Sequence, residues 1–253
     1  MKKQRKERCL ILPDLHQDIE WAELVLEKEA DQTDQIVFLG DYFDSRKPVS
    51  DIASARETAG FIKEVKDRFG DRVTLLVGNH DLPYIEGAPA FAKGISDFSP
   101  QYPCSGFEPA KGREIFTEWD LPWLSHLRLL TEVQGFLLSH AGIAPEFWPN
   151  ESTPAKSLAE FQNRCQTAWE NFREQDEPLL SAGESRGGFQ ETGGLLWLDW
   201  NDEFVDALPY PQIVGHTVDF SQGLRKKGRS YCLDNAQSTY GILVDGTLSA
   251  HLP

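Results

Sequence analysis

Apolar runs alternate with amphipathic stretches along the first 80 residues, and this order predicts strands that alternate with helices. Three short apolar runs, Cys9–Pro13, Ile36–Leu39 and Val73–Val77, have the length and composition of buried strands. Residues 51–69 carry apolar side chains at three- and four-residue steps, the spacing of one helix face, and a shorter helix is expected over residues 19–26. This arrangement is typical of βαβ units with a largely parallel sheet.

The pattern is weaker after residue 82, where Pro, Gly and Ser are frequent. We interpret residues 83–112 as irregular, residues 114–131 as partly helical and residues 155–177 as a helix. Further strands are expected at Val133–Leu138, at Ile213-Val214 and, as two or three hairpin strands with a turn at Asp245-Gly246, within Ser230–His251.

Composition narrows the class of protein. A chain of 253 residues can bury the core of one large α/β domain. Since no repeat or linker divides it, we expect a single domain over residues 1–253, with residues 1–8 as a basic tail. The formal net charge of -15 disfavours nucleic acid and anionic membranes as partners, and no apolar stretch is long enough to span a bilayer. The four cysteines form no CxxC pair, which is typical of reduced thiols and favours a cytoplasmic location.

Five apolar runs each end in a short cluster of residue types that bind metals. The clusters are Asp14-Leu15-His16, Gly40–Asp44, Gly78–Asp81, His140–Gly142 and Gly215–Thr217. Ligands bind outside the carboxyl ends of the strands in open α/β sheets, so these clusters can converge on one place. Asp, Asn and His suit Mn²⁺, Fe and Zn²⁺. Asp41 is the natural candidate to bridge two cations, which together can clamp a phosphoryl group.

The ordered set DxH, GDxxD, GNH(D/E), HAG and GHT resembles the calcineurin-like metallophosphoesterases. It is most similar to the phosphoprotein phosphatase branch and its bacterial relatives that act on phosphoproteins or diadenosine tetraphosphate. The resemblance runs from Asp14 to about Asp245. It implies an α/β fold, a four-layer α/β/β/α sandwich with two mixed β-sheets flanked by helices, and a metal site at one sheet edge.

The resemblance also implies a role for each matching residue. The metal ligands would be Asp14, His16 and Asp41 for the first ion, and Asp41, Asn79, His140 and His216 for the second. His80 would be the general acid that protonates the leaving oxygen, and Asp44 would orient it. Two divalent ions, expected to be Mn²⁺ with Fe or Zn²⁺ as alternatives, would hold a bridging hydroxide that attacks phosphorus in line, without a phosphoenzyme.

Three positions depart from the pattern of the phosphoprotein phosphatases. Pro13 and Gln17 occupy the places of the glycines that flank the first motif. Ser45 stands where an arginine directly follows GDxxD, and Arg46, one residue later, is a candidate phosphate contact. Val218 replaces the second histidine of the GHxH motif, which favours the phosphatase-like branch over the nuclease-like branches.

The expected reaction is hydrolysis of a phosphate monoester in a phosphoprotein or a small phosphorylated molecule. A dinucleoside polyphosphate hydrolase is the alternative enzyme, and a metal-binding scaffold that has lost catalysis is the alternative from another class. Specificity is expected from residues 83–112 and 145–194. Within the latter, the glycine-rich stretch 181–194 is interpreted as a surface loop, or as a lid that brings Arg186 to the phosphate as a second candidate substrate contact.

Overall fold

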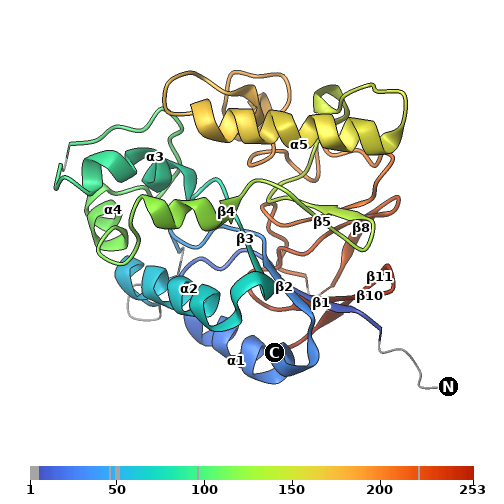
Figure 1. Cartoon of the computed structure of the whole chain (residues 1–253), viewed down its shortest axis with the longest axis horizontal. Helices are drawn as coiled ribbons and strands as arrows, with labels where there is room; N and C mark the ends of the chain where they lie inside the picture. The colour runs from blue at the N-terminus through green and yellow to red at the C-terminus, as the bar shows by residue number, and fades with distance from the viewer. Residues whose placement is uncertain (1–5, 46, 49–51, 96, 222) are drawn as a thin grey trace.

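Two mixed sheets form the centre of the computed structural model, which describes residues 6–45, 47–48, 52–95, 97–221 and 223–253 (Figure 1). The first sheet has the order β11 (Thr247–His251), β10 (Tyr240–Val244), β1 (Arg8–Leu12), β2 (Gln35–Phe38), β3 (Val73–Leu76) and β4 (Leu127–Arg128). The second has the order β5 (Thr131–Val133), β6 (Phe136–Leu138), β7 (Gln212–Val214), β9 (Ser230–Cys232) and β8 (Arg225–Lys227). Strands β1 to β4 are parallel to one another, as are β6, β7 and β9. Within each of these two sets, the carboxyl ends of the strands lie at the same edge of the sheet.

Helices cover the outer faces of both sheets. The α-helices are α1 (Ile19–Glu29), α2 (Ala55–Phe69), α3 (Leu82–Phe91), α4 (Pro109–Ile115) and α5 (Pro154–Asn171). Short 3₁₀ turns occupy Ala30–Gln32, Gly70–Arg72, Pro122–His126, Pro145–Phe147, Pro178–Leu180 and Glu184–Arg186. Figure 1 shows α1 and α2 together on one side of the molecule and α5 on the opposite side. The buried side of α5 shares a core cluster with Leu137 of β6. The expected four-layer α/β/β/α sandwich is therefore confirmed.

Strand β1 shows why the central strands are continuous apolar runs. Leu10 and Leu12 belong to the core beneath the helices, whereas Cys9 and Ile11 belong to a second core between the two sheets. Successive strand residues point to opposite faces, so a strand covered on both faces must be apolar at every position.

Helix α2 matches its expected span, apart from its start. Residue 51 lies outside the described residues, and the helix begins at Ala55 because Ser54 caps it. The Ser54 hydroxyl accepts from the Glu57 amide, and the Glu57 carboxylate accepts from the Ser54 amide. This reciprocal capping box satisfies two amides at the helix start that no helical carbonyl can reach.

The interpretation of residues 83–112 as irregular was wrong in part, because α3 and most of α4 lie within that stretch. Helix α3 was missed because it contains two prolines. Pro83 occupies the first turn, where a missing amide costs little, whereas Pro89 leaves the Ile85 carbonyl without its helical partner. Arg173 donates to that carbonyl at 2.8 Å, so a residue distant in sequence compensates for the proline.

Three other segments differ from expectation. Residues 133–138 form not one strand but the end of β5, a turn at Gln134-Gly135 and β6, with both turn residues at positive φ as a two-residue hairpin requires. The helix expected over residues 155–177 ends at Asn171. The tail forms the expected strands, but β9 lies in the second sheet while β10 and β11 pair in the first. Among the described residues, no helix is long and apolar enough to cross a membrane.

Candidate metal centre and active site

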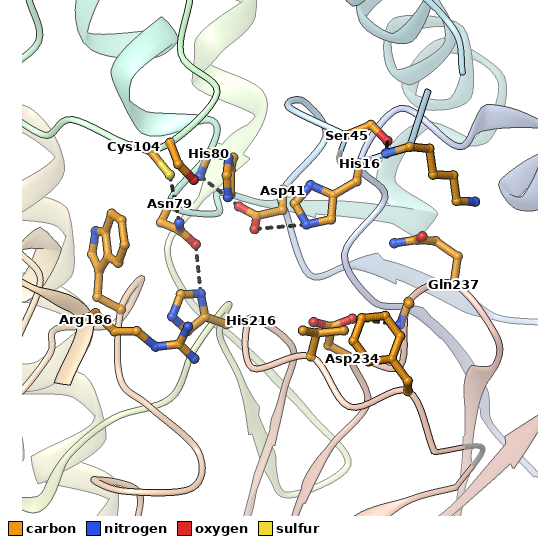
Figure 2. Close-up of a pocket in the computed structure, with 16 residues that line it drawn as sticks. His16, Asp41, Ser45, Asn79, His80, Cys104, Arg186, His216, Asp234 and Gln237 are labelled. Carbon is orange, nitrogen blue, oxygen red and sulfur yellow. Dashed lines mark hydrogen bonds and ion pairs between the residues drawn. The ribbon is translucent and has the colours of Figure 1, made fainter. Parts of the chain in front are cut away.

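The five sequence clusters meet in space. Residues that follow β1, β2, β3 and β7 line one pocket of about 500 Å³ (Figure 2). The lining includes His16, Asp41, Asn79, His80 and His216. The two remaining expected ligands lie in the same region but are buried, with His140 0 % and Asp14 1 % exposed.

Asp41 lies between two groups of metal-binding side chains. His16, Asp41 and His80 form one group, and Asp41, His140 and His216 form the other, each with donor atoms within 4.8 Å of one another. The Asp41 Oδ2 atom is 3.7 Å from His16 Nε2 and 3.4 Å from His140 Nε2. A carboxylate shared by two donor groups is what a bridging ligand requires.

The Asn79 amide oxygen lies beside both histidines of the second group. It is 2.9 Å from His140 Nε2 and 2.8 Å from His216 Nδ1. The Asn79 Nδ2 group donates to Cys104 Sγ at 3.1 Å, so the amide is held with its oxygen toward the histidines. Nothing in the sequence singled out Cys104, which reaches the site through the loop that follows α3.

The histidines are oriented as metal ligands usually are. His16 Nδ1 lies 3.0 Å from the Phe43 carbonyl oxygen, and His140 Nδ1 lies 2.9 Å from the Leu39 carbonyl oxygen. Donation of the Nδ1 hydrogen to a backbone carbonyl fixes the tautomer and leaves the lone pair of Nε2 available to bind a metal. In both residues Nε2 is the atom that faces Asp41. The donor set therefore fits a metal.

Asp14 is placed by the strand that carries His216. Its carboxylate accepts the His216 backbone amide at 3.0 and 3.1 Å, and Gly215 lies against one of its oxygens, where a Cβ would collide. Asp14 belongs to neither of the two closest donor groups. It joins the carboxyl ends of β1 and β7, which belong to different sheets.

Several of the expected ligands adopt a left-handed backbone, which costs about 1–3 kcal/mol each for residues other than glycine. The φ angles are 44° at His16, 52° at Asp41 and 66° at His216. Gly40 and Gly78 permit this close arrangement, since a Cβ on either would overlap the other loop. Backbone strain at three expected ligands indicates that contacts with the surrounding fold hold these residues in place.

Asp81 connects the loops that follow β2 and β3. No role was assigned to it from the sequence. Its fully buried carboxylate accepts the backbone amides of Asp41, Tyr42 and Gly78, each at 2.8 Å. It thereby ties the loop after β2 to the loop after β3. The sequence did contain a signal for this residue, since Asp81 is the last residue of the GNH(D/E) motif.

Gln17 gives a physical reason for one departure from the family pattern. It occupies the place of a glycine and has the positive φ, 63°, that this turn demands. Its side-chain oxygen accepts the amides of Asp44 and Ser45, and its amide group donates to the Ala53 carbonyl. The side chain thus holds the loop that presents Asp44.

His80 and Asp44 face each other inside the protein. His80 Nδ1 is 3.5 Å from Asp44 Oδ2, and both atoms are buried without a hydrogen bond among the described residues. Such contacts are often long in the absence of substrate and tighten when it binds. Burial alone would lower the pKa of His80, but Asp41 and Asp44 raise it to about 11 in the metal-free protein. The imidazole is therefore protonated in the metal-free protein.

Buried charge makes the centre receptive to cations. Burial raises the pKa of the Asp14 carboxyl, and the nearby Asp234 and Asp41 raise it further. Burial also lowers the pKa of His140 and His216, which keeps both rings neutral, as metal ligands must be. Buried carboxylates beside neutral imidazoles need positive charge, and bound metal ions would supply it.

Of the two arginines predicted to contact the substrate, the structure describes one. Arg46 lies outside the described residues. Arg186 lines the pocket, and Figure 2 shows its side chain beside His216. Its Nη2 atom donates to Thr217 Oγ1 at 2.8 Å and is 2.6 Å from an oxygen of Asp199. The 3₁₀ turn Glu184–Arg186 carries it, within the glycine-rich stretch.

Fold and site together define a metal-dependent phosphoesterase. The family model for calcineurin-like phosphoesterases matches residues 8–240, and the chain belongs to that family. Its members depend on two metal ions, and the chain is accordingly a phosphoesterase hydrolase.

One solved structure shares the fold, and two others match with lower TM-scores. A cold-active protein-tyrosine phosphatase of a psychrophilic Shewanella has a TM-score of 0.60 and 15% identity, over 97% of this chain and 80% of that one. A metallophosphoesterase from Sphaerobacter thermophilus has a TM-score of 0.47 and 17% identity, over 98% and 88%. A putative diadenosine tetraphosphatase has a TM-score of 0.48 and 15% identity, over 98% and 94%. No curated protein sequence matches this chain significantly.

Proposed function

We propose that the protein hydrolyses phosphate monoesters at a two-metal centre bridged by Asp41. The observation that most strongly supports this proposal is that Asp41 belongs to both close groups of donor side chains. The residues that would hold the metals are Asp14, His16, Asp41, Asn79, His140 and His216. When bound, the two ions supply positive charge at the phosphoryl oxygens and activate the attacking water.

The chain's own residues handle the leaving group. His80 is 5 % exposed and lines the pocket, so its proton is sheltered from bulk water yet can reach a bound ester. His80 Nδ1 faces Asp44, which leaves Nε2 as the atom that donates to the leaving oxygen. As the P–O bond breaks, that oxygen departs as a neutral alcohol or phenol, and Asp44 stabilises the ring's orientation throughout.

The charge of the pocket favours a monoester over a polyphosphate. Besides the imidazole of His80, Lys47 and Arg186 are the cationic side chains among its described lining residues, and each is already paired, with Asp18 and Asp199 respectively. A monoester dianion can be matched by the metals and one arginine. A tetraphosphate chain carries several more charges, for which the described lining offers little compensation. Dinucleoside polyphosphate hydrolysis stays the alternative.

Loops also support selection among monoesters. Cys104 and Ser105 reach the pocket from the 83–112 stretch, and Arg186 reaches it from the 145–194 stretch. Trp197 and the exposed ring of Phe220 add apolar surface at the same pocket. A leaving group with an apolar or aromatic part can pack there while the phosphate lies at the metals.

The test is a substrate panel with Mn²⁺, Fe²⁺ or Zn²⁺ added to metal-free protein. The panel contains 4-nitrophenyl phosphate, phosphoserine and phosphotyrosine peptides, nucleoside monophosphates and diadenosine tetraphosphate. We expect phosphate release from monoesters to exceed cleavage of the tetraphosphate. Preferential cleavage of the tetraphosphate would support the alternative enzyme, and no turnover with any metal would support a silent scaffold.

Arg186→Met should weaken binding of the phosphate group more than it slows chemistry. A charge-assisted hydrogen bond is worth about 1.5–3 kcal/mol, so KM for 4-nitrophenyl phosphate and the inhibition constant of inorganic phosphate should each rise about 10- to 100-fold. Metal content should stay unchanged. Arg229→Met is the matched control, since Arg229 pairs with Asp206 outside the pocket. Unaltered KM and phosphate inhibition in Arg186→Met would rule out the contact.

A further inference from the structure

The Asp44 carboxylate has more partners than its expected role requires. Its side chain is fully buried, with 0 % exposed. The Oδ1 atom accepts the Tyr84 hydroxyl at 2.7 Å and the Lys111 ammonium at 2.8 Å. The Oδ2 atom has neither of these partners and faces His80. The two carboxylate oxygens are therefore used for different purposes.

We propose that Lys111 is a positioning residue for the general acid, which it holds in place through Asp44 with the help of Tyr84. The proposal rests on the role of His80 proposed above. Two donors fixed on Oδ1 prevent the carboxylate from rotating about its Cβ–Cγ bond. That restraint keeps Oδ2 directed at His80 Nδ1, so that Nε2 points to the leaving oxygen.

Lys111 is itself held firmly for this task. Its ammonium also donates to the Gly106 carbonyl at 2.9 Å, and Glu108 lies 3.6 Å away. Gly106 has a φ of 87°, and a Cβ there would come within 3.0 Å of the Asp44 Cβ, so the loop rests directly on Asp44. Only 25% of the Lys111 side chain is exposed. The ammonium thus has a fixed position between its loop and the buried carboxylate.

Charge gives a second reason for a lysine at this place. A buried carboxylate is costly without a counter-charge. His80 can supply one only while it holds its proton, and it must give that proton to the leaving group. The Lys111 ammonium takes no part in the transfer of that proton, so Asp44 keeps this partner after the proton has left. A neutral donor such as the Tyr84 hydroxyl cannot provide this.

Lys111→Met should selectively impair esters that need an acid. Alkyl phosphates have poor leaving groups, and we expect their kcat to fall about 10-fold or more, as a fraction of the ~10²–10⁴-fold that general acids contribute. For 4-nitrophenyl phosphate, whose leaving group departs unprotonated, the fall should stay below about 2-fold. Lys111→Arg should restore most of the alkyl ester activity, because the guanidinium keeps a charged donor at Oδ1.

A double-mutant cycle separates positioning from a general loss of structure. In a His80→Asn background, Lys111→Met should have almost no further effect on alkyl esters, since its target is absent. Lys63→Met is the matched control, because the half-buried Lys63 ammonium bonds to the Glu118 carbonyl and not to the site. Tyr84→Phe removes only one hydroxyl and gives a second variant with the same selective defect, should Lys111→Met be unstable.

The outcomes are distinct. Equal slowing of alkyl and aryl esters by both Lys111→Met and Tyr84→Phe, or effects that simply add to those of His80→Asn, would overturn the positioning role while the phosphatase function stands. Absence of turnover in the unmodified protein with every ester and metal would instead refute the proposed function, and the positioning role with it.

Discussion

Asp41→Asn should abolish phosphatase activity and remove one of the two bound metal ions. An amide cannot bridge two cations as a carboxylate does, and the loss of a metal removes several kcal/mol of transition-state stabilisation, or at least about 10³-fold in kcat. The fold should survive, because asparagine tolerates the left-handed backbone at this position, where φ is 52°. Its side-chain oxygen can also keep the bond that Asp41 Oδ1 accepts from the His80 amide.

Metal analysis and calorimetric titration with Mn²⁺ measure this result directly. The stoichiometry should fall from two ions to about one. Asp245→Asn is the matched control, since Asp245 also has a positive φ, 48°, but lies in the turn between β10 and β11. If Asp41→Asn kept two tightly bound ions and normal turnover, the bridging role would be wrong.

His80→Asn should have the second largest effect, and one that depends on the leaving group. Without the acid, kcat for alkyl phosphates should fall about 10²–10⁴-fold, whereas 4-nitrophenyl phosphate should be slowed much less. The slope of log kcat against the leaving-group pKa should become steeper across a series of aryl and alkyl esters. Metal content should be unchanged, because the expected donors of both ions remain in place.

The matched control for this prediction is His126→Asn, since His126 is exposed and packs on Trp123 outside the pocket. Equal slowing of every ester by His80→Asn would contradict proton donation. Loss of a metal ion in that variant would also be informative, since His80 lies within 4.8 Å of His16 and Asp41 and could then be assigned as a ligand.

The fold was largely predictable where both faces of a strand are buried. Strands β1, β2 and β3 lie within a residue or so of the expected runs, because burial on two sides forces every position to be apolar. Prediction failed where distant contacts decide the structure. Helix α3 contains Pro89, and the Arg173 side chain, far along the chain, bonds to the carbonyl that this proline leaves without a helical partner. The hairpin at Gln134-Gly135 was missed because residues 133–138 were interpreted as a single strand, although two turn residues lie within them.

The candidate site shows the same division. The residue types at the strand ends predicted the candidate ligands, since a metal requires particular donor atoms whatever the fold. The residues that position those candidate ligands were assigned no such role from the sequence. Asp81, Gln17 and Lys111 act through hydrogen bonds to loops and carboxylates that only the folded chain brings within reach.

The sequence by itself determined the alternation of strands and helices over the first 80 residues, the family and the residue types expected to bind metals, because periodicity and donor chemistry are local properties of the chain. The tertiary structure alone decided that Asp41 belongs to both groups of donor side chains and that the Lys111 ammonium contacts the Asp44 carboxylate. These are contacts between segments distant in sequence, and their geometry is fixed by how the two sheets and the loops at their edge pack together.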